Sequence, residues 1–257
     1  MKLYLMCLAT IRPGRHPVPA YLVQTDDGIN ALVDTGVPKA LIGAHNESWE
    51  TVFEMDEEVH VLNQLARIGV APEDIRYLIC THYDVDHVGN HEDFPAAELV
   101  VQRAHHLAAR SLPRFQETAM HWDAPGQRRR LVDGDTELLP GIELIECGGH
   151  VPGHQAVLVR LPETGHVLLA IDAIPHSLLV NPDTRPKQPS DMDEAGGAPK
   201  YAQVSGSRPA RRRHASRARP RSWAVGRASA AARLPRLKDP GGTRGARMGR
   251  PPSGARP

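Results

Sequence analysis

The stretch THYDVDHVGNH holds five side chains that can bind a metal ion: His82, Asp84, Asp86, His87 and His91. Imidazole and carboxylate ligands together suit zinc, manganese or iron. A single His or Asp there would indicate a polar surface loop, but several ligand types at such close spacing favour a metal site. One short loop seldom surrounds an ion, so the remaining ligands must come from elsewhere in the chain.

A second group of candidate ligands lies in the segment 147–176. It opens with a turn rich in Gly and Pro that holds His150 and His154, followed by the runs QAVLVRL and HVLLAID on either side of PETG. Two apolar runs joined by a short turn with Gly are typical of a β-hairpin. This hairpin would place His150 before one strand and Asp172 at the end of the next, while His154 and His166 are interpreted as structural or exposed.

The elements next to the first group must hold it in place. The apolar run IRYLIC, residues 75–80, is typical of a buried strand and ends directly before the ligand-rich loop. Ahead of it, apolar residues recur at helical spacing over residues 61–68, and Gly69 and Pro72 end that pattern. The order helix, strand, loop is one in which a rigid scaffold presents reactive groups. The N-terminal run MKLYLMCLA is interpreted as the first strand.

These motifs, in this order, resemble the metallo-β-lactamase superfamily, whose signature is H-x-H-x-D-H, a later His, a bridging Asp and a last His. The likeness is closer to its N-acyl-homoserine lactonases, through ALVDTGVP, GVAPEDIRYLICTH, VVQRAHHLAA, GDTELLPGIELIECGGHVPGHQ and VLLAIDA, and covers roughly residues 1–180. The resemblance implies an α/β fold, namely a four-layer αββα sandwich with metals at one edge of the two sheets. The C-terminal strands and helix of that sandwich are expected to be missing from this chain.

The resemblance also implies two divalent metal ions. By this pattern, the first ion takes His82, Asp84 and His150. The second ion takes Asp86, His87 and a final His further along the chain, and Asp172 bridges the two ions. Two ions together lower the pKa of a bridging water, polarise a lactone carbonyl and hold the leaving alkoxide.

Other roles follow from the same resemblance. Asp86 is placed to shuttle a proton. Together with Asp172, and with His176, which is not part of the family pattern, it forms the predicted catalytic group. Asp34, in LVDTG at the end of the first predicted hairpin, either orients the metal ligands from outside the site or caps a turn. Both interpretations of Asp34 are open.

Three features depart from the family pattern. Asp84 stands where most members have a second His, and a carboxylate favours manganese or iron over zinc. Pro175 stands where well-studied lactonases have a Tyr that helps to hold the substrate carbonyl, and the adjacent His176 is either a donor or acid, or a surface residue. His214 is the one His after His176, and it lies in ARRRHASRARPRS, so the final ligand is lacking and the second metal site is expected to be weak.

Charge divides the chain into two parts. Residues 198–257 hold 16 basic residues and one acid, Asp239, for a net charge of +15, whereas residues 1–197 hold 15 basic and 29 acidic residues, for a net charge of −14. The tail is rich in Arg, Pro, Gly, Ala and Ser without helical or strand periodicity, and such a composition cannot bury enough apolar surface to become ordered. We therefore expect an incomplete hydrolase domain over residues 1–197 and a disordered tail over residues 198–257.

Two interpretations of the tail are open. It is either a basic arm that binds nucleic acid through counterion release, or the product of a GC-rich gene read in the wrong frame. The second is favoured. If residues 217–220 were encoded CGG GCA CGA CCC, a one-base shift would read Gly-His-Asp, which is the turn that carries the family's last His.

The leading hypothesis is a cytoplasmic metal-dependent hydrolase that opens acyl-homoserine lactones or related esters, with activity impaired by the incomplete second site. One alternative is a hydrolase of phosphodiesters whose tail binds nucleic acid, and another is a partly folded chain that binds metal without turnover. No membrane partner is expected, because the sequence has no long apolar run. Cys80 and Cys147 are interpreted as core residues, and His105 and His106 as residues on an exposed helical face.

Overall fold

The computed structural model describes residues 1–12, 14–41, 52–181, 186–192 and 224–225, all within one compact unit, Met1–Gly226. The predicted domain boundary at residues 197 and 198 lies outside the described residues. So does the predicted tail, apart from Ala224–Val225, which form a short strand that the sequence pattern did not indicate. None of the described helices is long and apolar enough to cross a bilayer.

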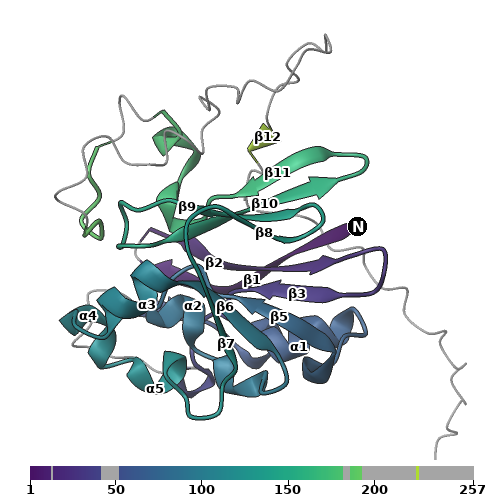
Figure 1. The fold of residues 1–257 in the computed structure, drawn as a ribbon. Helices are drawn as coiled ribbons and strands as arrows, with labels where there is room; N and C mark the ends of the chain where they lie inside the picture. Colours follow the sequence, from purple (N-terminus) through teal and green to yellow (C-terminus); the bar gives the residue numbers. More distant parts are fainter. Residues whose placement is uncertain (13, 42–51, 182–185, 193–223, 226–257) are drawn as a thin grey trace, which may run out of the picture. The chain divides into compact units, whose positions relative to one another are not determined.

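The strands of the N-terminal half of the chain form a seven-stranded sheet (Figure 1). Its strand order is β4-β1-β2-β3-β5-β6-β7, antiparallel from β4 to β3 and parallel from β3 to β7. The bounds of its strands are β1 (Lys2–Arg12), β2 (His16–Gln24), β3 (Asn30–Val33), β4 (Val52–Glu54), β5 (Ile75–Ile79), β6 (Glu98–Gln102) and β7 (Arg129–Val132).

A second sheet of five strands has the order β12-β11-β10-β9-β8. Its pairs are antiparallel except for β11 and β12, which run parallel. The bounds of its strands are β8 (Thr136–Leu139), β9 (Ile142–Glu146), β10 (Gln155–Leu161), β11 (Gly165–Leu169) and β12 (Ala224–Val225). The predicted hairpin is confirmed, because β10 and β11 pair with Val157 opposite Leu169.

Five α-helices lie on the face of the seven-stranded sheet that is turned away from the second sheet (Figure 1). They are α1 (Val61–Arg67), α2 (Val85–Val88), α3 (Arg103–Ala109), α4 (Pro113–Gln116) and α5 (Ala119–Trp122). Helices, sheet and sheet make three layers of the expected sandwich. The part of the chain that the structure describes after Trp122 contains no α-helix, so it does not include the expected fourth layer. The prediction that the C-terminal strands and helix are missing concerns residues outside the described part.

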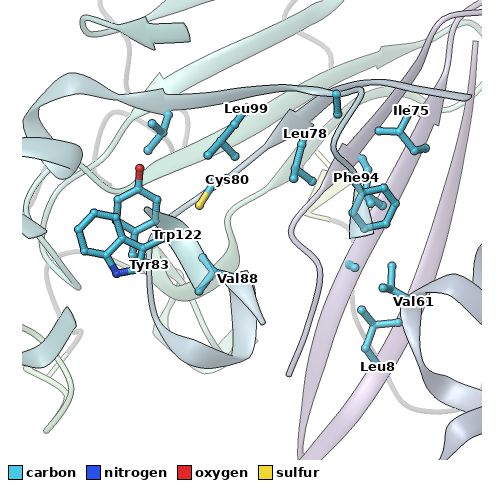
Figure 2. Packing of buried hydrophobic residues seen from close by; sticks show 14 of the residues in the cluster. Leu8, Val61, Ile75, Leu78, Cys80, Tyr83, Val88, Phe94, Leu99 and Trp122 are labelled. Atoms are coloured by element: carbon cyan, nitrogen blue, oxygen red, sulfur yellow. The ribbon is translucent and has the colours of Figure 1, made fainter. Parts of the chain in front are cut away.

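Residues of β5 face both neighbouring layers, which explains why its buried positions, Ile75, Leu78 and Ile79, are all apolar. Leu78 packs among the residues under the helices, and the next residue, Ile79, packs between the two sheets, since successive strand side chains point to opposite faces. Burying each such side chain contributes about 1.5–3 kcal/mol. Figure 2 shows the cluster under the helices, in which the rings of Tyr83 and Trp122 stack with their centroids 4.6 Å apart.

The expected positions of two histidines are wrong. His105 and His106 lie on α3, as the sequence indicates, but their side chains are buried rather than exposed. His106 approaches the hydroxyl of buried Tyr83, with 3.0 Å between that oxygen and its Nδ1. Cys80 and Cys147 are buried core residues, as predicted.

Candidate metal centre

The candidate ligands meet at one edge of the sandwich. β3 and β5 are parallel neighbours, so their carboxyl ends lie at the same edge, and Asp34 follows β3 while the ligand loop 81–87 follows β5. His150 comes from the turn between β9 and β10, and Asp172 from a single 3₁₀ turn directly after β11. Four separate connections thus supply the site.

The first predicted ligand set forms a tight group with the predicted bridge. His82, Asp84, His150 and Asp172 each offer one ligand atom, and these atoms all lie within 4.8 Å of one another. The Oδ2 atom of Asp84 lies 3.1 Å from Nε2 of His82 and 3.0 Å from Nε2 of His150. Two imidazoles and two carboxylates that converge in this way suit a divalent ion.

Asp172 lies between the two predicted ligand sets. Its Oδ2 atom is 3.7 Å from Nε2 of His82, 3.5 Å from that of His150 and 3.6 Å from that of His87. The Oδ2 atom of Asp86 is also 3.6 Å from Nε2 of His87. Asp86 and His87 are therefore adjacent to the tight group, and the His87 ring centroid is 4.1 Å from that of His82. The resemblance assigns these two residues to a second ion.

An unsatisfied buried atom tests whether this group fits a metal ion. The Nε2 atom of His82 is fully buried and has no hydrogen bond of acceptable geometry, although it faces Asp84 and Asp172. Leaving a buried polar atom unpaired costs about 1–3 kcal/mol. A metal ion at the group would accept the lone pair of that nitrogen, so the residues fit a divalent ion.

The charged side chains shift one another's pKa values. Burial alone would raise the pKa of Asp84, but His82, His150 and Arg114 outweigh it and hold that pKa well below its usual range. Burial would lower the pKa of His87, but Asp86, Asp34 and Asp172 raise it well above the ordinary value. Burial raises the pKa of Asp86, and the charges of Asp172 and Asp84 raise it further against the lowering effect of His87.

Asp34 supports two of the ligands from behind. Its Oδ2 atom accepts hydrogen bonds from Nδ1 of His87 at 2.9 Å and from Oγ1 of Thr81 at 2.7 Å, and its Oδ1 atom accepts one from the Thr81 amide at 2.8 Å. The Thr81 hydroxyl in turn lies 3.0 Å from Nδ1 of His82. Since Thr81 gives its proton to Asp34, it accepts one from His82. Both imidazoles are thereby oriented with Nε2 toward the cluster, which is the usual work of an outer-shell carboxylate.

Asp34 has a strained backbone. Its φ is +58°, in the left-handed region that an L residue other than Gly seldom adopts. The turn is held by hydrogen bonds from the Asp34 amide to the Ile79 carbonyl and from the Thr35 amide to the His87 carbonyl. Strain of this kind persists where surrounding contacts fix the conformation, and here those contacts come from the end of β5 and from the ligand loop.

His105 joins the two loops that carry ligands. Its Nε2 atom accepts a hydrogen bond from the Tyr83 amide at 2.9 Å, and its Nδ1 atom donates one to the Pro152 carbonyl at 2.8 Å. Tyr83 follows His82, and Pro152 lies two residues after His150. Burial lowers the pKa of His105 to about 3, which keeps the neutral form that this bridge requires.

Other candidate residues lie apart from the tight group. His176 is exposed, four residues after Asp172, and is not a member of the group. His91 is buried, and neither of its ring nitrogens has a hydrogen bond among the described residues. His154 is buried beside the site, with its ring centroid 5.0 Å from that of His82. His214 lies outside the described residues.

Three residues of the site were missed by sequence reasoning. Thr81 directly precedes a predicted ligand, so its hydroxyl could have been noticed. Arg114, on α4, donates from Nε to Oδ1 of Asp84 at 2.7 Å, and Asp191 lies with Oδ1 3.8 Å from Nδ1 of His150. Neither of these two contacts has a signal in the sequence, because each joins segments that are far apart in the chain.

Comparison with known proteins agrees with this geometry. The family model of the metallo-beta-lactamase superfamily matches residues 13–198. An N-acyl homoserine lactonase from a Bacillus species is 35% identical over 174 residues, which cover 64% of this chain and 68% of that protein. The N-acyl homoserine lactonase AttM of Azorhizobium caulinodans is 30% identical over 171 residues, which cover 61% of this chain and 65% of that protein.

A solved structure shares the fold. It is an N-acyl homoserine lactone hydrolase with the product N-hexanoyl-L-homoserine bound at the catalytic metal center, and it matches with a TM-score of 0.61 and 30% sequence identity. The match covers 66% of this chain and 75% of that chain. The chain therefore belongs to the metallo-beta-lactamase superfamily, in its N-acyl homoserine lactonase-like branch, and is a metal-dependent hydrolase.

Proposed function

We propose that this protein opens the lactone ring of N-acyl homoserine lactones. The observation that carries the proposal is the group formed by His82, Asp84, His150 and Asp172, in a chain that is 35% identical to an N-acyl homoserine lactonase over 174 residues. Related lactones and esters share the same electrophilic carbonyl and are the next substrates to consider.

The ligands are assigned as follows. His82, Asp84 and His150 would hold a first divalent ion, Asp172 would bridge, and Asp86 and His87 would hold a second ion. When bound, such ions polarise a carbonyl and acidify a water molecule. Zinc is the first candidate metal, and the carboxylate of Asp84 adds manganese and iron.

The chain's own residues supply the proton transfer and the orientation. Asp86 lies beside His87 and adjoins the metal group, so it is the carboxylate placed to take a proton from the attacking water and give it to the leaving alkoxide oxygen. Asp34 and Thr81 keep Nε2 of His82 and His87 directed at the reacting centre. His176 is the proposed donor to the substrate carbonyl, in place of the Tyr that the lactonases have near this position.

The proposed activity of this chain is low, because the second ion lacks a final His ligand among the residues the structure describes. The proposal is tested by loading the full chain with Zn²⁺ or Mn²⁺ and following proton release from N-hexanoyl homoserine lactone at constant pH. Variants His82→Ala and Asp172→Ala should abolish the metal-dependent rate. Exposed His16, at the start of β2, provides a matched control, since His16→Ala should leave the rate unchanged.

Two other outcomes would replace the proposal. Hydrolysis of a phosphodiester such as bis(p-nitrophenyl) phosphate, without lactone opening, would support a phosphodiesterase and direct attention to the basic residues 198–257. Tight metal binding without turnover of either substrate would identify a chain that binds metal but does not catalyse.

A further inference from the structure

The pairing of Asp84 with Arg114 is a feature of the site that the proposed function does not explain. Asp84 occupies the motif position at which the resemblance leads us to expect a His. The guanidinium of Arg114 contacts both of its carboxylate oxygens: Nε donates to Oδ1 at 2.7 Å, and Nη2 donates to Oδ2. A two-pronged pair of this kind fixes the plane of the carboxylate as well as its position.

The two oxygens of Asp84 have different surroundings. Oδ1 is held by Nε of Arg114, whereas Oδ2 accepts from Nη2 of Arg114 and also lies 3.1 Å from Nε2 of His82 and 3.0 Å from Nε2 of His150. Oδ2 is therefore the oxygen that faces the metal cluster. Oδ1 is the oxygen through which Arg114 can hold the side chain while Oδ2 binds an ion.

Arg114 is itself held from two sides. The adjacent Phe115 on α4 is fully buried, with its ring edge-on to that of His105 and the centroids 5.1 Å apart. At the other end of the side chain, Nη1 of Arg114 donates to the Ser190 carbonyl at 2.7 Å. The guanidinium therefore has a defined place, and it also lies beside His150, with 3.3 Å between Nη2 and Nε2 of that imidazole.

The pairing with Arg114 also compensates the negative charge of Asp84. An Asp in place of a His adds a negative charge to a cluster that already contains Asp86 and Asp172. The ligand atoms of Asp84 and Asp172 lie within 4.8 Å of each other, and like charges that close repel. The guanidinium of Arg114 is always charged and cancels that addition. The pair as a whole carries the net charge of the neutral imidazole that it replaces.

We propose that Arg114 is a positioning residue for the metal ligand Asp84, and that the two residues act together in place of one His. The proposal rests on the proposed function in one respect, because both require an ion at the group formed by His82, Asp84, His150 and Asp172. It adds a specific claim, namely that Arg114 strengthens metal binding only when residue 84 is Asp.

The test is a cycle of four full-length proteins: the unmodified chain, Arg114→Gln, Asp84→His and the double variant. Each is stripped of metal and titrated with Zn²⁺ in competition with a chromophoric chelator, which gives the Kd of the first ion. Arg114→Gln should raise this Kd about 10–100-fold, the usual effect of losing an outer-shell partner. In the Asp84→His background the same change should lower the Kd, because the guanidinium is then an unpaired cation beside a dication.

Two further variants make the cycle interpretable. Arg114→Lys retains the positive charge but loses the planar guanidinium that contacts both carboxylate oxygens. It should raise the Kd by less than Arg114→Gln, and this partial rescue by a conservative change would not be expected if the effect of Arg114→Gln came from loss of the fold. Arg103→Gln removes an exposed guanidinium whose Nε donates to Asp133 at 3.0 Å. Neither residue is a proposed ligand, so this change should leave the Kd unchanged. Circular dichroism of the metal-free proteins establishes that each variant is folded.

Three results would overturn the proposal. Equal fold-changes for Arg114→Gln in both backgrounds would show that Arg114 does not act through Asp84. Tighter Zn²⁺ binding by Arg114→Gln in the Asp84 background would show that the guanidinium competes with the ion for the carboxylate. Absence of Zn²⁺ binding by the unmodified chain would instead remove the metal centre itself, and the proposed function with it.

Discussion

The carboxylate of Asp34 lies 2.9 Å from Nδ1 of His87, across 53 positions of sequence, and it is fully buried. The same oxygen accepts the hydroxyl proton of Thr81, which orients His82. One residue at the end of β3 therefore orients an imidazole in each of the two predicted ligand sets. Of the two interpretations of Asp34 left open by the sequence, this geometry favours support of the ligands.

Replacing Asp34 should weaken metal binding without removing a ligand. Asp34→Asn retains the size of the side chain but loses the charge that holds both imidazoles, so metal affinity and lactone-opening rate should each fall about 10–100-fold. Isothermal titration with Zn²⁺ and the proton-release assay measure the two effects. Asp133→Asn, which removes an exposed acid paired with Arg103, is the matched control, and equal effects of the two changes would contradict the assignment.

The two metal sites should differ in affinity. His82, Asp84, His150 and Asp172 lie within one tight group, whereas Asp86 and His87 adjoin it and the expected final His ligand is not among the described residues. Elemental analysis after loading and gel filtration should therefore give clearly fewer than two ions per chain, and His150→Ala should abolish the tighter one. Two ions held equally tightly would show that a further ligand exists.

His91 should affect acid stability but not metal binding. Burial lowers the pKa of its imidazole to about 3, against about 6.5 in the unfolded chain, so between these values only the unfolded state takes up the proton. The free energy of unfolding should therefore fall by about 1.4 kcal/mol per pH unit, for this one group, as the pH decreases from 6.5 toward 3. Denaturant melts at several pH values should show a shallower decline for His91→Leu, with an unchanged Zn²⁺ Kd. An unchanged slope would contradict this account.

Restoring the reading frame should raise activity. If the gene is shifted near codon 196, a chain with the frame restored gains the Gly-His-Asp turn and should bind two ions and open lactones faster than the present chain. The DNA sequence across codons 190–257 and a side-by-side assay of both proteins measure this. Equal turnover by the two chains would show that residues 198–257, most of which lie outside the described structure, do not limit the chemistry.

The sequence by itself predicted the local elements correctly. Residues 61–67 are helical, residues 75–79 form a buried strand, and β10 and β11 form a hairpin, because each of these depends on apolar periodicity and turn residues within a short segment. The ligand loop after β5 was predicted for the same reason. The resemblance then named a later His and Asp as its partners, and the structure brings His150 and Asp172 to that loop.

The tertiary structure alone decided which side chains support the ligands. Asp84 and Arg114 are 30 positions apart, and Asp34 and His87 are 53 positions apart, so their contacts depend on strand order in the sheet and on how α4 is anchored by Phe115. His105 was predicted to be exposed because a short helix with polar residues gives no sign of what packs over it. Its burial follows from the turn at Pro152, which only the pairing of β9 with β10 brings against α3. Periodicity records the environment of a single segment, whereas the partner of a polar group is set by segments that meet only after folding.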